Sequence, residues 1–249
     1  MARAWEGVLP KISLFVAVLI TLAMLGIALT SARRDAVDLT HVAPATAGML
    51  AWGSGVLFAF AGAARVFERD RADGIRGLLD ARGRGVMAYV GSRAGGLAVL
   101  LAAPIAIGSV LTGLAAAAAA TTWPRTIAAL EGTLGALLYA IAFAAVLAPV
   151  SLAALGARSR AGGYGVLFFV LVLPSALAPL TAKIVPSGWE ELVSIPGAVD
   201  AFRDGVLPPF DPLGSLRALI ALALVVGLAV AIVRAQLARS EAEHPRGAR

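Results

Sequence analysis

The chain has 249 residues, of which 59% are hydrophobic and 14% are charged. A soluble globular domain has about 45–50% apolar and about 25% charged residues, so this composition excludes an ordinary soluble domain and indicates an integral membrane protein. The net charge of +6 does not indicate nucleic-acid binding, because the arginines lie at the ends of apolar runs without aromatic residues between them.

Apolar runs long enough to cross a bilayer recur along the chain. A spanning helix needs about 20 largely apolar residues, and six runs meet this requirement. They predict an all-α, polytopic membrane protein whose transmembrane helices cover residues 12–31, 42–64, 94–122, 132–157, 164–182 and 213–233. The first run is followed by Ser31-Ala32-Arg33-Arg34 and not by a small-residue cleavage pattern, so we expect a retained span and not a signal peptide.

A dense group of charges, residues 65–93, separates the second span from the third; we call it the charged segment. Ile75, Leu78 and Leu79 recur at helical spacing, and opposite charges lie four residues apart. The charged segment therefore predicts an amphipathic helix at the membrane surface.

A second polar segment, residues 183–211, precedes the last span. Its part from 189 to 206 is expected to form one or two short amphipathic helices that are broken at Pro196.

Lys and Arg are distributed unevenly between the two sides of the predicted bundle. Fifteen of the 21 lie on the side of the N-terminus, the charged segment, the turn at 158–160 and the C-terminal tail. The positive-inside rule predicts that this side, with both termini, is cytoplasmic. Segment 183–211 is then external.

The predicted helix of the charged segment has two interpretations. It either lies on lipid headgroups or docks into a groove of another protein. Anionic headgroups would repel its carboxylates. Two glycines would also destabilise a helix that only lies on the lipid surface, so we favour docking into a protein groove. The expected contact surface consists of Glu68, Asp70, Asp73, Gly74, Ile75, Arg76, Leu78 and Leu79.

These features resemble the type-2 ABC exporter permeases. The resemblance lies in the order of six spans, in FERDRADG at 67–74 with the Leu pair at 78–79, and in the long segment before the last span. The chain is most similar to the heme exporter protein B family of cytochrome c maturation, through VAP at 42–44, Pro104, and GARSRAGG at 156–163 leading to VLVLP at 170–174. The similarity covers roughly residues 42–181.

The resemblance implies that the charged segment is a coupling helix in the cleft of a separate cytoplasmic ABC ATPase. The chain itself is then not an enzyme: its two lysines, Lys11 and Lys183, do not follow a Gly-rich phosphate loop, so ATP and Mg belong to the partner. We expect no cofactor on this chain, with heme as one candidate substrate. The partners would be the ATPase, a second permease subunit in a homo- or heterodimer, cytochrome c assembly proteins and the lipid of a bacterial inner membrane.

Two other functions fit the same sequence. One is a general ABC-2 exporter of lipid, glycan or drug-like substrates. The other is a membrane scaffold that transports nothing and uses the charged segment to bind another cytoplasmic protein.

Three prolines inside predicted spans, Pro149, Pro174 and Pro179, are candidate hinges, because proline removes an intrahelical hydrogen bond. The alternative is that helix packing tolerates them passively.

Glu131 is the one acidic residue placed within an apolar run. An intramembrane carboxylate is a functional candidate, but a structural polar contact near Arg125 is the favoured reading. If heme is the substrate, His41, at the external end of the transport path, is the imidazole candidate for a heme ligand. The alternative is that His41 is an ordinary exposed histidine. We expect no metal site, and a chain without cysteine has no thiolate ligand.

Overall fold

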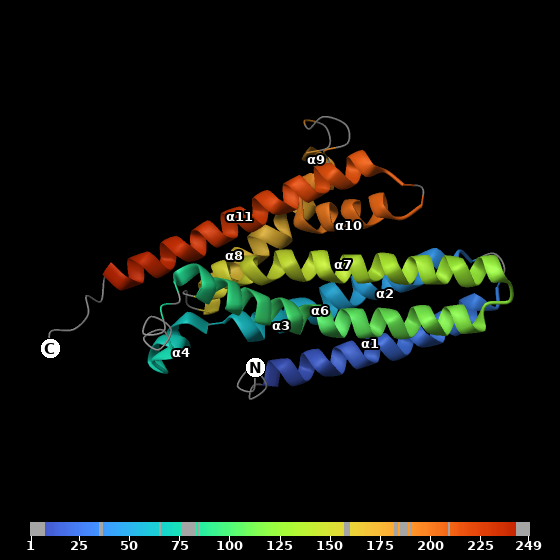
Figure 1. The fold of residues 1–249 in the computed structure, drawn as a ribbon, viewed down its shortest axis with the longest axis horizontal. Coiled ribbons are helices and arrows are strands. Elements are labelled where there is room, and N and C mark those ends of the chain that lie inside the picture. Colours follow the sequence, from blue (N-terminus) through green and yellow to red (C-terminus); the bar gives the residue numbers. More distant parts are fainter. Residues whose placement is uncertain are drawn as a thin grey trace.

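The structure, a computed structural model, describes residues 8–34, 37–64, 66–75, 83, 85–156, 160–181, 184, 189, 191–208 and 210–242. Within these ranges every regular element is a helix, which confirms the predicted all-α class. Five helices are long and apolar enough to cross a membrane (Figure 1). They are α1 (Val8–Ala32), the composite Leu39–Asp70, α6 (Val86–Ala119), α7 (Trp123–Leu155) and Pro212–Arg239 of α11 (Pro212–Ala242).

The second of these helices is built from several pieces. In order they are η2 (Leu39–His41), α2 (Val42–Leu50), the π-helical turn η3 (Ala51–Gly55), α3 (Val56–Ala63) and α4 (Val66–Ala72). A π turn disturbs the regular backbone hydrogen bonding, and here the buried hydroxyl of Ser13 in α1 donates to the carbonyl of Ser54 at 2.8 Å. This bond satisfies a buried carbonyl and ties α1 to the turn.

The predicted span at 164–182 is not one long helix. It consists of α8 (Arg160–Leu171) and α9 (Leu173–Thr181), which are separated at Val172. Pro174 follows this break and has no N–H to donate to the preceding turn, which explains its position. The count of six spans is therefore not confirmed, since five helices of the described chain have the length to cross.

The beginning of α1 and the end of α11 nevertheless lie towards the same end of the bundle (Figure 1). This end also carries α4, the beginning of α6 and the end of α7. The bent pair of α8 and α9 returns the chain towards the other end before α11 begins.

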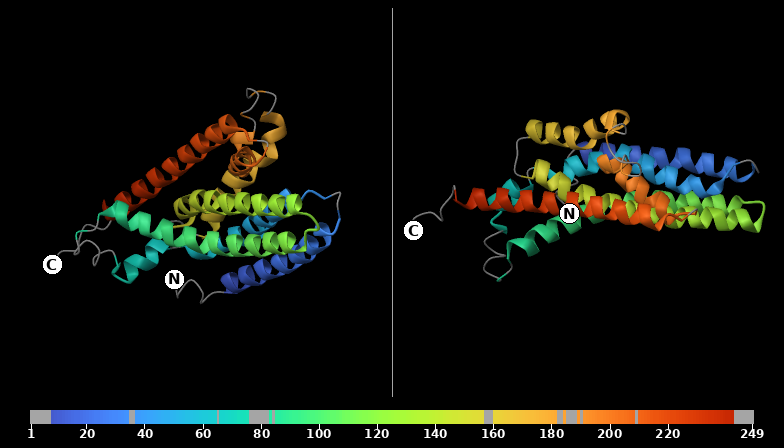
Figure 2. Two further views of the ribbon diagram at one scale, coloured as in Figure 1. Left: turned by 45° about the vertical axis from the view of Figure 1, so that its right-hand side comes forward. Right: turned by 90° about the horizontal axis from the view of Figure 1, so that it is seen from above.

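The polar segment before α11 contains η4 (Glu191–Val193) and α10 (Ile195–Val206). Pro196 lies in the first turn of α10, where a backbone N–H would have no partner within the helix, so proline costs no hydrogen bond there. The Ser194 hydroxyl caps this end by accepting a hydrogen bond from the N–H of Gly197 at 3.1 Å. The proline thus begins the helix and does not break it. α10 packs against both α7 and α11 (Figure 2).

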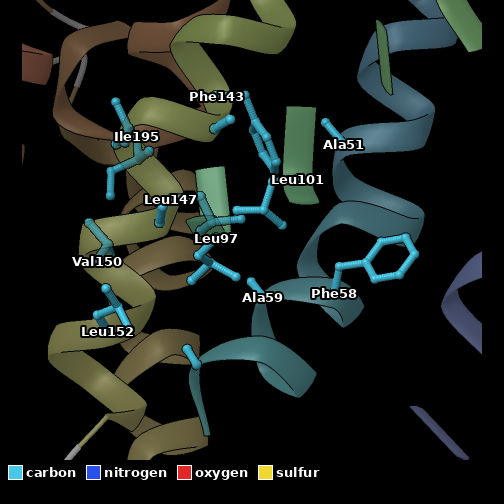
Figure 3. Close-up of a cluster of buried hydrophobic side chains, with 14 of the residues drawn as sticks. Ala51, Phe58, Ala59, Leu97, Leu101, Phe143, Leu147, Val150, Leu152 and Ile195 are labelled. Atoms are coloured by element: carbon cyan, nitrogen blue, oxygen red, sulfur yellow. The ribbon is translucent and has the colours of Figure 1, made fainter. Parts of the chain in front are cut away.

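Helix α7 lies at the centre of the bundle. In its most apolar stretch 72% of the residues are buried, against 22% in α1 and in α11, whose outward faces are rich in Leu, Val and Ile. Figure 3 shows Leu97 and Leu101 of α6 between Leu147 of α7 and Ala59 of α3. The outer helices therefore bury one stripe each against α7 and leave apolar side chains for lipid.

A close contact between α7 and the chain before α2 generates the first prediction. At Gly132 an added Cβ would overlap the backbone carbonyl of Thr40, whereas at Gly227 in α11 there is open space. We expect Gly132→Ala to lower the free energy of unfolding by about 1–3 kcal/mol through overpacking. Gly227→Ala should be neutral or slightly stabilising, because alanine is the better helix former. Thermal unfolding in detergent checks this, and equal melting temperatures of the two variants would contradict it.

Candidate functional site

The charged segment is divided between two helices in the structure. α4 ends at Ala72, Gly74 has a φ of +66° that favours glycine, and α6 begins at Val86. The predicted amphipathic helix is therefore interrupted at residues 73–74; Ile75 is helical again, and the last part of the charged segment, from Val86, belongs to α6. Arg76, Leu78 and Leu79 lie outside the described residues.

Asp70 joins these two helices. Its side chain is 7% exposed, and its carboxylate accepts from the Tyr89 hydroxyl at 2.7 Å and from Nη2 of Arg93 at 2.6 Å. Tyr89 and Arg93 are four residues apart on α6, so both reach the same side of that helix. The sequence placed Asp70 on an outer edge that meets a partner, whereas the structure directs its carboxylate into the fold.

Phe67 attaches α4 to α7 as well. Its side chain is buried, its N–H donates to the carbonyl of Gly156 at 3.3 Å, and its ring centroid lies 6.0 Å from that of Tyr89. The N–H of Phe67 has no intrahelical partner so close to the beginning of α4, and the end of α7 supplies the acceptor. Two contacts, one to α6 and one to α7, therefore fix the position of α4.

A hollow of about 590 Å³, which we call the charged cleft, opens between α3, α4, α6 and the end of α7. Its rim is polar and its floor is apolar. Among the described residues, the rim includes Arg69, Asp70, Asp73, Ser92 and Arg93, and the floor includes Ala61, Gly62, Leu97, Leu100 and Leu152. Ile75 also lines it. The described part of the charged segment thus lines a concave surface in addition to carrying exposed side chains.

Of the other residues predicted for the docking surface, Glu68 and Asp73 are exposed and Ile75 is half-buried. Glu68 lies on α4, and Asp73 and Ile75 follow it. Tyr89, Arg93 and Phe67 were not among the predicted site residues. The spacing of Tyr89 and Arg93 was a signal for a shared helix face, but nothing in it pointed to Asp70.

The hinge candidates have different positions. Pro149 is buried inside α7, which continues past it to Leu155, so α7 accommodates this proline without ending. Pro174 follows the break between α8 and α9, and Pro179 lies within α9.

The contact expected between Arg125 and Glu131 is not formed in the structure. Arg125 Nη2 instead lies within hydrogen-bond distance of the carbonyls of Ser31, Arg34 and Val37, with the shortest distance, 2.7 Å, to Arg34. It thereby holds the end of α1 and the turn after it. Glu131 is exposed on α7, and no ion pair to it forms within the described ranges.

His41 is an exposed residue whose Nε2 lies 3.6 Å from the carboxylate of Asp38. Hydrogen bonding from Thr40 holds the pKa of Asp38 below its usual value, which favours the charged form of this carboxylate. No group of three His, Asp or Glu residues in the described part of the chain is arranged to hold a metal ion.

Comparison with models of known protein families, with curated proteins and with solved structures gave no match. Fold and site define the class of a helical membrane protein with a charged cleft at one end of its bundle.

The buried carboxylate gives the second prediction. Asp70→Asn leaves the Arg93 guanidinium without its counter-charge; because Arg93 is 32% exposed, we expect a cost below the about 3–5 kcal/mol of a fully buried pair. We expect a lower melting temperature in detergent for Asp70→Asn. Glu131→Gln, which neutralises an exposed carboxylate, should change the free energy of unfolding by less than about 0.5 kcal/mol. A wild-type melting temperature for Asp70→Asn would show that the pair does not hold α4.

Proposed function

We propose that this chain is the membrane-spanning permease subunit of an ATP-driven exporter of the ABC-2 class. The observation that supports it most is the double attachment of α4, to α6 through Asp70 and to α7 through Phe67. A charged loop that served only to connect two spans would not require an ion pair with a buried carboxylate. A segment that transmits force does require a stiff connection to the helices that it moves.

The attachments suggest how force enters the bundle. A cytoplasmic ATPase that binds the charged segment through Glu68, Ile75 and the residues up to Leu79 would displace α4 when it closes on ATP and Mg. The Asp70 pair passes this displacement to the beginning of α6, and the bond from Phe67 to Gly156 passes it to the end of α7. The π turn η3 and the break at Val172 are the points where the connected helices bend most easily.

The complete exporter is then a dimer of permease subunits with two copies of the ATPase. In this arrangement the bent pair of α8 and α9 completes a sixth crossing, and both termini and the charged segment are cytoplasmic. The favoured pathway is heme export in cytochrome c maturation at a bacterial inner membrane, on the resemblance of residues 42–181. Cytochrome c assembly proteins would be its neighbours.

A general ABC-2 exporter is the second candidate. Heme iron is commonly held by histidine, and this chain has two histidines, His41 and His244, both outside the predicted spans. This distribution favours a cargo that needs no iron ligand within the membrane, such as a lipid or another amphipathic molecule.

Docking of the ATPase is tested at the Leu pair of the charged segment. Replacing Leu78 and Leu79 with Asp places two charges on the proposed contact and should abolish co-purification of an ATPase subunit from native membranes, while the permease still inserts. Ile184→Asp, which adds a charge at a residue 86% exposed on the proposed external side, should not affect co-purification. Undiminished recovery of the ATPase with the double variant would refute the docking surface.

The proposed orientation is tested with single cysteines, because the chain contains none. We expect Asp200→Cys to react with an impermeant maleimide added to intact cells, and Asp80→Cys to react only in inverted vesicles. The cysteine-free chain controls for background labelling. Reaction of both positions from the same side would overturn the arrangement.

A further inference from the structure

Helix α10 follows one face of α7. Leu207, directly after α10, covers Gly135 so closely that an added Cβ on this glycine would lie 2.7 Å from the leucine side chain. One turn away, the guanidinium of Arg203 lies over the ring of the buried Tyr139, with 5.5 Å from Cζ to the ring centroid. Leu207 and Arg203 are four residues apart, as are Gly135 and Tyr139, so each pair shares one side of its helix. α10 is therefore held on α7 at two successive turns.

Two carboxylates of the same helix orient Arg203. Its Nε lies 2.6 Å from Asp204 and its Nη1 lies 3.1 Å from Asp200, and the arginine side chain is 18% exposed although both carboxylates are exposed. A cation over an aromatic face is stabilised more where water is excluded from it. Arg203 is thus a cation, largely withdrawn from solvent, that attaches α10 to α7.

Tyr139 is also bonded to the π turn η3. Its hydroxyl accepts from Nε1 of Trp52, a residue of η3, at 3.0 Å. Phe143, one turn further along α7, stacks on Tyr139 with 6.2 Å between the ring centroids and meets the edge of Trp52 at 5.2 Å. Gly55 of η3 lies against Phe143 as well, since an added Cβ there would come within 3.0 Å of the ring. Contacts therefore run without a gap from Arg203 through the aromatic rings to η3.

We propose that α10 is a latch that holds the π turn in its described form. While Arg203 covers Tyr139, the ring is fixed against Trp52, and η3 keeps its π-helical hydrogen bonding. When α10 leaves α7, the ring loses the group on its face, the bond to Trp52 weakens, and the turn can change to ordinary α-helix. Single π turns inside α-helices are uncommon and occur often at functional sites.

The composition of the contact argues against α10 being a simple cover for α7. The buried residues Ile195, Ala198 and Val199 of α10 already provide apolar packing. A guanidinium withdrawn from water adds a cost that its partners must offset. Its position on the one ring that also bonds to η3 gives it a use beyond packing. The latch is a property of the resting chain and does not depend on transport.

The test measures the accessibility of the turn at a residue outside α10. Ser54→Cys places a thiol at a buried position of η3, and the full-length protein in detergent is labelled there with N-ethylmaleimide. We expect Arg203→Gln to raise the labelling rate about tenfold, because the contact with Tyr139 is lost. Arg217→Gln is the matched control. It removes a guanidinium that lies over Trp189 at 5.9 Å, and the rate at Ser54→Cys should not change.

Two further variants distinguish the latch from a general loosening of the bundle. Tyr139→Phe keeps the ring but removes the acceptor of Trp52. Ser54→Cys should then react fast in this background, and adding Arg203→Gln should raise the rate little further. Leu207→Ala weakens the other contact of α10, at Gly135, and should raise the rate at Ser54→Cys in the same direction as Arg203→Gln.

Three results would overturn the proposal. The first is an unchanged rate at Ser54→Cys while faster labelling of Val199→Cys, buried in α10, shows that this helix has left α7. The second is an equal rise with Arg217→Gln, and the third is an undiminished effect of Arg203→Gln in the Tyr139→Phe background. Leu207→Ala keeps the first result decisive even where Arg203→Gln does not fold, because it leaves the ion pairs of Arg203 in place.

Discussion

Close packing of the other helices on α7 is the constraint on which the rest of the structure depends. Helices in lipid gain no hydrophobic energy from meeting each other, so they associate through van der Waals contact between small residues. α7 has glycine and alanine along much of its length, and 72% of its most apolar stretch is buried. At Gly132 the carbonyl of Thr40 approaches so closely that no larger residue fits. The neighbours of α7 are therefore positioned by backbone shape.

Polar contacts are placed at intervals along this helix. Near its beginning, Arg125 holds the carbonyls that follow α1. Midway, the buried Tyr139 accepts a hydrogen bond from Trp52 at 3.0 Å and lies under the guanidinium of Arg203 from α10, at 5.5 Å from the ring centroid. At its end, the carbonyl of Gly156 receives the N–H of Phe67. Each contact attaches a different segment to α7, so a displacement of α4 reaches the helix that also contacts α10.

The sequence was sufficient to predict the all-α class and most of the long apolar helices, because both follow from the hydrophobicity of single residues. Runs of about 20 apolar residues have one stable form in lipid, a helix, since every backbone group must find its partner internally. The break at Val172 was less predictable. Pro149 and Pro174 look alike in sequence, yet α7 continues past the first and α8 ends before the second, because Pro149 is buried in the packed centre of the bundle.

The candidate site shows the limit of reasoning from local pattern. Helical spacing placed Asp70 among the charges of an exposed edge, and its partners are 19 and 23 residues away on another helix. No periodicity within α4 encodes this. Pro196 was similarly ambiguous, since a proline breaks a helix in its interior and begins one in its first turn, and the Ser194 cap decides between them. Long-range pairing and capping became visible only in the folded chain.

The proposed docking surface and the proposed latch are both attached to α7, and this has a thermodynamic consequence. Phe67 attaches α4 to the end of α7, and Arg203 attaches α10 to its middle. The composite helix connects the two again, since it carries Trp52 and continues into α4. The proposed ATPase, by shifting α4, would change the position of the π turn, and hence the stability of the contact between α10 and Tyr139. By linkage, a ligand that stabilises one position of α10 would change the affinity for the ATPase by the same factor. Tyr139 would be the residue that connects the two.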